Sequence, residues 1–213
     1  MKEFLSPGRY IDSDHAAVIE FARKHVKGSS DLERAVSLYY AVRDGIRYNP
    51  FLDFSRDTAF QGSQCLATGE GFCIGKAALL AACARAVGIP ARVGFADVKN
   101  HLTTARLAER MGTDLFVYHG FAELWLEGKW VKATPAFNLE LCRKFRVKPL
   151  EFDGRSDSIF HPFDADDRRH MEYLRSRGSY ADVPVAEIQQ VFRETYPALY
   201  GLGKEAAKEA FSP

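Results

Sequence analysis

The sequence predicts an α+β fold with N-terminal helices, an antiparallel sheet and a helical C-terminal extension. Three observations lead there. Apolar residues recur at helical spacing in the first 43 residues, a hairpin pattern surrounds Glu127-Gly128, and helical patterns return after Asn138. The chain has 213 residues, of which 46% are hydrophobic, so it can bury a sizeable core. We expect a core over residues 1–137 and an extension over residues 138–213 packed on it.

Two amphipathic helices are expected first. Residues 12–27 place apolar side chains at helical spacing, and Asp12 or Ser13 can serve as the N-cap. Ser30 caps a second pattern that continues to about Arg43, with a continuous apolar face. These helices are expected to pack against the core.

The next segment leads to the most informative part of the chain. Residues 48–71 are rich in Asn, Pro, Asp, Ser, Gln and Gly, which predicts a long loop of the kind that is often functional. Residues 74–87 then predict an apolar helix, which Gly88 and Pro90 end. A strand is expected over residues 91–98.

A hairpin is predicted over residues 115–126 and 129–134, with Glu127-Gly128 as its two-residue turn. In that register Trp125 faces Trp130 and Glu123 faces Lys132, and both pairs are favourable across strands. Phe121 faces Thr134. His119 therefore lies diagonal to Thr134, on the same face of the hairpin.

The other expected elements are shorter. They are a helix over residues 102–111, a helical turn over 139–145, helices over about 166–177 and 184–195, and an amphipathic piece near the end. The intervening residues 151–167 are polar and rich in turn formers.

Cys73 and His119 carry the chemistry. Cys73 stands where the loop becomes a helix, and a thiol there feels free N–H groups and the helix dipole, which lower its pKa and favour the thiolate. A histidine brought beside such a thiol completes a nucleophile–base pair. The backbone N–H of Cys73 would contribute to an oxyanion hole, with Gln64 or Gln61 as a second donor. The residues favour a thiol-dependent acyl-transfer enzyme.

A family resemblance supports this interpretation. Several motifs taken together resemble those of the bacterial transglutaminase-like superfamily. They are Gly71-Phe72-Cys73-Ile74-Gly75-Lys76-Ala77-Ala78-Leu79-Leu80, Gly88-Ile89-Pro90-Ala91-Arg92, His119, Ala122-Glu123, and Gly128-Lys129-Trp130-Val131 through Pro135. The resemblance covers roughly residues 66–135. It implies a papain-like layout in which the helix headed by the catalytic Cys packs on an antiparallel sheet that bears His and Asp. It also implies that Cys73 is the nucleophile and His119 the base.

The third member departs from the family pattern. Where that pattern has Asp, this chain has Thr134, whose hydroxyl can accept the imidazole N–H bond but carries no charge. Asn138 is an alternative, and so is an acid from elsewhere, such as Asp97 or Asp157. The hairpin register favours Thr134.

The remaining cysteines are expected to be structural. Cys83 lies in an apolar helix and is assigned to the core, and Cys142 is also expected to be structural. Cys65 precedes Cys73 in the loop and could modulate it by forming a disulfide, but a buried thiol is the favoured interpretation. No pair has CxxC spacing, so a structural zinc site is not expected. No other metal and no cofactor is expected either.

Composition excludes several classes. There are 29 basic and 28 acidic residues and no basic stripe, so a nucleic-acid partner is not expected. The N-terminus has no apolar region of a secretory signal and no run reaches membrane-spanning length, so we expect a cytoplasmic protein without a membrane partner. The expected partner is a peptide or another amide-containing substrate.

Two alternatives remain. One is a non-catalytic descendant that keeps the fold as a binding or scaffolding module, which the absent Asp supports and the retained Cys73 and His119 oppose. The other is a metal-dependent hydrolase. It would use the cluster His161, Asp164, Asp166, Asp167 and His170, which helix capping and solvation explain more simply.

Overall fold

The computed structural model describes residues 1–101, 105–159, 166, 171–198 and 200. Its elements, in chain order, are η1 (Lys2–Phe4), α1 (Ala16–His25), α2 (Asp31–Gly45), β1 (Arg47–Tyr48), η2 (Asp57–Phe60), α3 (Gly62–Thr68), β2 (Glu70–Gly71), α4 (Cys73–Ala86), β3 (Ala91–Asn100), α5 (Ala105–Met111), β4 (Leu115–Leu126), β5 (Lys129–Ala133), α6 (Leu139–Phe145), β6 (Met171–Tyr180) and α7 (Val185–Thr195).

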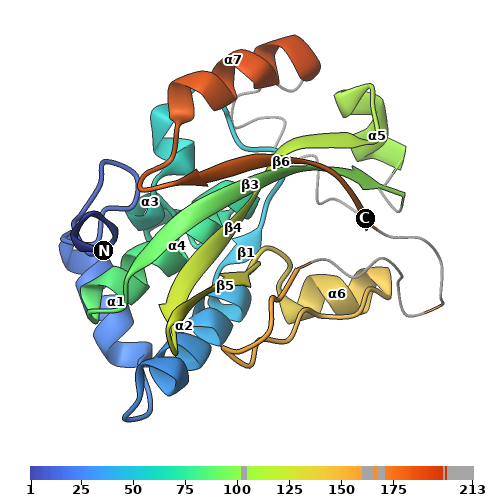
Figure 1. Ribbon diagram of the computed structural model, residues 1–213. Helices are drawn as coiled ribbons and strands as arrows, with labels where there is room; N and C mark the ends of the chain where they lie inside the picture. Colours follow the sequence, from blue (N-terminus) through green and yellow to red (C-terminus); the bar gives the residue numbers. More distant parts are fainter. Residues whose placement is uncertain (102–104, 160–165, 167–170, 199, 201–213) are drawn as a thin grey trace.

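The main sheet has four strands in the order β5-β4-β3-β6, and every neighbouring pair is antiparallel (Figure 1). A separate two-stranded sheet joins β1 and β2 in parallel and pairs Tyr48 with Gly71, two residues before Cys73. The α+β class and the antiparallel sheet predicted from the sequence are confirmed.

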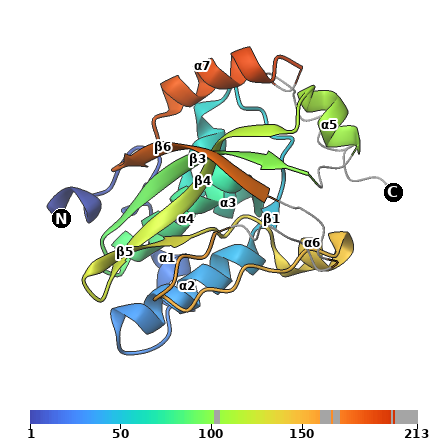
Figure 2. The same cartoon turned by 45° about the vertical axis from the view of Figure 1, so that its right-hand side comes forward.

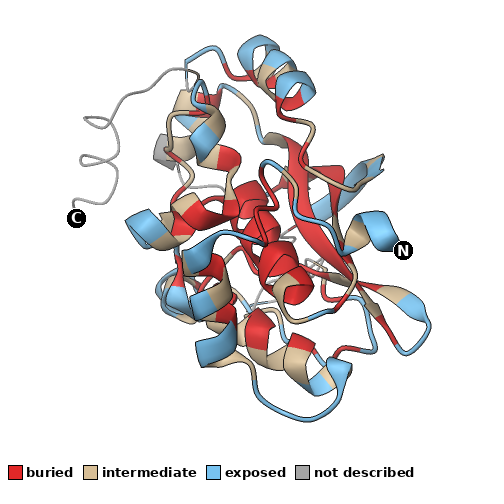
Figure 3. Cartoon of the chain, turned by 90° about the vertical axis from the view of Figure 1, so that its left-hand side faces the viewer, coloured by how far each residue is buried: buried red, intermediate tan, exposed pale blue. Residues whose placement is uncertain are grey.

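The helix α4 forms the centre of the fold. Every residue from Cys73 to Arg85 is buried, and Figure 3 shows α4 as a buried rod among helices on one side and the sheet on the other. The other helices against it are α1, α2 and α3. A helix that is apolar all round is stable only when other elements enclose it, which explains this position.

The hairpin between β4 and β5 has the predicted register, with Trp125 opposite Trp130 and Glu123 opposite Lys132. Both turn residues have positive φ, 48° at Glu127 and 84° at Gly128, as a type I′ turn requires. The Trp125 and Trp130 rings lie 5.4 Å apart edge to face. The predicted register and the contact between the two tryptophans are therefore confirmed, whereas the Glu123 carboxylate forms its ion pair with Arg92 of β3 and not with Lys132.

The N-terminal helices differ in their caps. Ser30 caps α2 as predicted, and the structure adds a capping box with Glu33. However, α1 begins at Ala16 with His15 as N-cap, so the expected cap at Asp12 or Ser13 is wrong. Asp12 instead accepts the Ser63 N–H at 3.1 Å and therefore stabilises the start of α3.

Two larger predictions were also wrong. The segment 48–71 is not one loop, because η2, α3 and β2 lie within it. The segment expected to form a helix over residues 166–177 contains β6, which pairs with β3 at the edge of the sheet. An edge strand with mostly exposed side chains needs no regular apolar alternation, so its pattern resembled a polar helix.

The predicted helices over residues 139–145 and 184–195 correspond to α6 and α7, and that over 102–111 to α5 in its described part. Figures 1 and 2 both show α7 beside the β6 edge of the sheet. There Phe192 packs against Phe54, with ring centroids 5.3 Å apart. The amphipathic piece expected near the end falls outside the described residues. None of the helices described here is long and apolar enough to cross a membrane.

Candidate active site

Cys73 is the first residue of α4 and is 8% exposed. Burial is the largest influence on its thiol pKa and raises it to about 11. The nearby backbone N–H groups of Gly120, Ile74 and Cys73 itself favour the thiolate and lower the pKa by a smaller amount. The expectation of a lowered pKa is therefore wrong for the free protein, because loss of solvent outweighs the helix N-terminus.

His119 lies on β4, directly before Gly120, and is 2% exposed. Burial lowers the pKa of its imidazole to about 3. Since the thiol pKa is raised and the imidazole pKa is lowered, both groups are neutral around pH 7. Ionising either of them alone costs free energy in this buried position.

Gly120 brings β4 and α4 together. A Cβ at this position would stand 2.9 Å from the Ile74 Cα and 3.3 Å from its nitrogen, closer than side chains pack. Only glycine lets the strand approach the first turn of α4 so closely. β5 pairs with β4 only as far as Ala122, and the stretch containing His119 and Gly120 continues beyond that pair. His119 therefore directly precedes the residue at which β4 approaches the first turn of α4, the turn that begins at Cys73.

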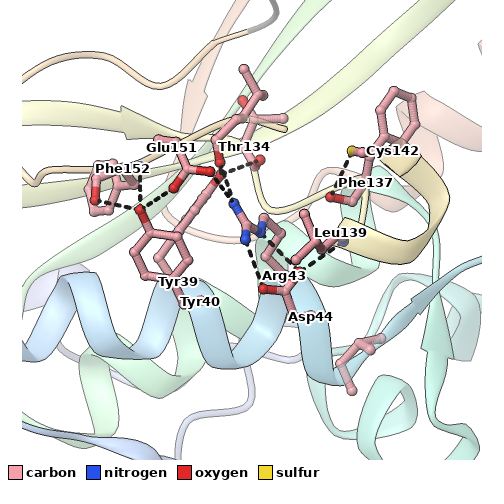
Figure 4. Close-up of polar contacts among 12 residues, drawn as sticks. Tyr39, Tyr40, Arg43, Asp44, Thr134, Phe137, Leu139, Cys142, Glu151 and Phe152 are labelled. Atoms are coloured by element: carbon pink, nitrogen blue, oxygen red, sulfur yellow. Dashed lines mark hydrogen bonds and ion pairs between the residues drawn. The ribbon is translucent and has the colours of Figure 1, made fainter. Parts of the chain in front are cut away.

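Thr134 follows the last residue of β5 and is 1% exposed. Its backbone N–H donates to the Ser158 carbonyl at 3.1 Å, and its carbonyl accepts the Tyr39 hydroxyl at 3.1 Å (Figure 4). Its own hydroxyl is buried and has no hydrogen-bond partner among the described residues. A buried hydroxyl with spare capacity is able to accept an imidazole N–H.

The other candidates for the third member are engaged elsewhere. The Asn138 side-chain oxygen accepts the Tyr48 N–H at 3.2 Å. Asp97 pairs with Arg177 at 2.8 Å, and the exposed Asp157 accepts the Lys132 N–H at 2.9 Å. Their oxygens hold structural contacts, whereas the Thr134 hydroxyl does not.

Of the two side chains predicted as a second oxyanion donor, Gln61 is engaged elsewhere and Gln64 stays a candidate. The Gln61 side chain donates to Asp12 at 3.0 Å. Gln64 lies half-buried on α3, and within the described part of the chain its side chain makes no hydrogen bond. The sequence analysis missed the backbone N–H of Gly120, which favours the Cys73 thiolate. A glycine directly after the histidine was the available signal.

Two tyrosines near the thiol were also missed. Burial raises the pKa of Tyr48 and of Tyr196, and the proximity of Cys73 raises each further. Tyr48 lies on β1, which pairs with β2, the strand that ends two residues before Cys73. Tyr196 follows α7, more than a hundred residues away in the chain, and no sequence pattern connects it with the site.

All four cysteines are buried and free, including Cys65, Cys83 and Cys142. The Cys65 sulfur would lie 2.6 Å from a Cβ at Gly71, so it fills the space beside the turn into α4. Most of the His and Asp cluster proposed as an alternative metal site lies outside the described residues. Its described member, Asp166, pairs with Arg146 at 2.8 Å. No group of three metal-binding side chains occurs in the part of the chain that the structure describes.

Comparison with known proteins places these residues in a family. The family model described as Transglutaminase-like superfamily matches residues 19–135, more than half of the 213-residue chain, and the match includes Cys73, His119 and Thr134. No curated protein matches the sequence. The fold is similar to the crystal structure of a candidate cysteine protease from Cytophaga hutchinsonii, with 19% identity and a TM-score of 0.47. That similarity covers 83% of this chain and 53% of the other, so this chain spans about half the length of that relative.

Proposed function

Because this chain belongs to the transglutaminase-like superfamily, we propose that it is a thiol-dependent acyl-transfer enzyme. In this proposal Cys73 forms a thioester with the acyl group of a peptide or another amide-containing substrate. His119 acts as general base and then as general acid. No cofactor takes part in these steps.

One observation carries the proposal. The Cys73 thiol lies at the start of a buried helix that β4 approaches closely at Gly120, and His119 directly precedes Gly120. The backbone N–H groups of Gly120, Ile74 and Cys73 favour the thiolate. A structural cysteine in a core needs no such set of donors. Cys83, on the same helix, is fully buried and has no comparable donors acting on its thiol.

Acylation in this proposal starts with both groups uncharged. The thiol and the imidazole are both neutral in the free protein, so the proton passes from Cys73 to His119 as the sulfur attacks the carbonyl carbon. The carbonyl oxygen gains negative charge, and backbone N–H groups at the start of α4 stabilise it. The imidazolium then protonates the leaving amine or alcohol, which gives the thioester and neutral His119.

Deacylation reverses the roles. His119 removes a proton from water, or from an amine, as that acceptor attacks the thioester carbonyl, and it then returns the proton to the departing Cys73 sulfur. With water the products are the acid and free enzyme, and with an amine they are a new amide and free enzyme. A competition between water and added amine at a fixed acyl donor distinguishes hydrolase from transamidase.

Thr134 orients the base in this scheme. Its buried hydroxyl, which makes no hydrogen bond to the described residues, has the capacity to accept the imidazole N–H and so to take the role of the family's Asp. A neutral acceptor stabilises the imidazolium less than a carboxylate does, so we expect Thr134→Asp to raise the acylation rate. An unchanged or lower rate in a folded variant would argue against this role.

The proposal is tested by acylation with a p-nitrophenyl ester of a short acid, followed by intact-mass measurement and peptide mapping. Cys73→Ala should lose the hydroxylamine-sensitive acyl adduct. Cys83→Ala, a matched change on the same helix, should keep it on Cys73. Equal acylation of both variants would overturn the proposal and favour the alternative, a binding or scaffolding module with this fold.

A further inference from the structure

The segment of β4 directly before His119 has an irregular backbone. Ala96 pairs with His119 and Val98 pairs with Phe116, so one residue of β3 stands opposite two residues of β4, Val117 and Tyr118. This is a β-bulge, a feature that redirects a strand and is frequent beside active sites. Tyr118 has a φ of 53°, which is unfavourable for a bulky residue unless its surroundings impose it.

Side chains accept hydrogen bonds from the backbone N–H groups of the two bulge residues. The Tyr118 N–H donates to Asp97 Oδ1 at 3.1 Å, and the Val117 N–H donates to the Tyr196 hydroxyl at 2.6 Å. The Tyr196 hydroxyl in turn donates to the Leu115 carbonyl at 2.8 Å. Both displaced donors are thus satisfied by side chains, one of them Asp97, which the sequence analysis considered only as a possible partner of the His119 imidazole.

Arg177 secures this arrangement from β6. Gly178 pairs with Phe95 and Ser176 pairs with Ala96, so Arg177 is an extra residue in its own strand. Its guanidinium donates to both oxygens of Asp97, at 2.9 and 3.0 Å from Nε, and lies 4.6 Å from the centre of the Tyr118 ring.

The ring of Tyr118 is fixed at its other end as well, because its hydroxyl donates to Glu187 of α7. The Asp97 side chain is 9% exposed and that of Arg177 16% exposed, so solvent screens their ion pair only weakly. A network of this kind holds one backbone conformation, because breaking either partner leaves a buried charge.

We propose that Asp97, Arg177 and Tyr196 form a clamp that holds the β4 bulge and so positions His119 toward Cys73. Two of the three members, Arg177 and Tyr196, lie beyond residue 135, where the family match ends. The segment after residue 138 therefore completes the site rather than only covering it. These are positioning residues, and this inference rests on the proposed function.

The test is a double-mutant cycle on the acylation rate of Cys73 by the p-nitrophenyl ester. Arg177→Gln should lower the rate about tenfold or more when His119 is present, because a 1 Å displacement of a catalytic group is costly. In the His119→Ala background the same change should alter the rate less than about twofold. A general loss of folding would lower both rates alike.

Three further variants make the result decisive. Arg175→Gln, an exposed arginine on the same strand, should leave the rate unchanged, and Arg177→Lys should restore part of it. Tyr196→Phe removes only a hydroxyl and should also lose rate only when His119 is present. If wild type acylates Cys73 but Arg177→Gln and Tyr196→Phe act equally in both backgrounds, the clamp is overturned. If wild type does not acylate Cys73, the proposed function itself fails.

Discussion

The close approach of β4 to α4 at Gly120 is open to a direct test with Gly120→Ala. The added methyl would stand 2.9 Å from the Ile74 Cα, 3.0 Å from its Cγ1 and 3.3 Å from its nitrogen. Backbone atoms of a buried helix cannot yield as the end of a long side chain can, so β4 and α4 must separate by about half an ångström or more. Overpacking of this kind costs about 1–3 kcal/mol. For a chain of this length, about 2 kcal/mol corresponds to a Tm lower by about 4–8 °C.

The same separation moves His119 and the Gly120 N–H away from the thiol. We expect Cys73 acylation to be slower by about one to two orders of magnitude, since a 1 Å misplacement can cost about a hundredfold. The assay combines thermal melting with stopped-flow acylation. Gly45→Ala is the control, because a Cβ there has nothing within 4 Å. A Gly120→Ala protein with wild-type Tm and wild-type acylation would refute the close approach.

Three further predictions concern buried groups. Burial lowers the pKa of Lys76 to about 7, so above that pH the unfolded chain binds more protons than the folded protein. The free energy of unfolding of wild type should therefore rise from pH 7 to 10 relative to that of Lys76→Met, by up to about 1.4 kcal/mol per pH unit. His119, with its pKa lowered to about 3, should make wild type lose stability relative to His119→Gln as pH falls from 6.5 toward 4. Urea titrations at each pH measure both differences, and parallel pH curves would contradict them. Tyr39→Phe leaves the Thr134 and Leu150 carbonyls without their shared donor and should cost about 1–3 kcal/mol, whereas a cost near zero would show that solvent replaces the hydroxyl.

Local patterns predicted what depends on neighbours in the chain. The hairpin register followed from the turn at Glu127-Gly128 and the tryptophan pair, and the structure has that register. Cys73 at the start of a helix also followed from local signals, because Gly71 and Phe72 precede an apolar helical run. Such features need only short-range geometry, which one sequence contains.

Features that depend on contacts between distant parts of the chain could not be predicted from local sequence patterns. The pKa of Cys73 depends on burial by the whole fold, which outweighs the helix N-terminus. β6 was mistaken for a helix because its own residues show no strand pattern. Its pairing with β3, a distant segment of the chain, makes it a strand. The bulge at Tyr118 depends on Asp97 and Tyr196, which lie 21 and 78 residues away in the sequence.

The central claim is that Cys73 reacts as a neutral thiol whose proton passes to His119. Its most direct test is the rate of Cys73 acylation from pH 6 to 9 in wild type and His119→Ala. The account predicts a nearly flat profile for wild type, because His119 stays neutral far above its pKa of about 3. In His119→Ala only the thiolate reacts, so the rate should rise about tenfold per pH unit toward the thiol pKa of about 11. Profiles of the same slope in both proteins would contradict the pairing of Cys73 with His119.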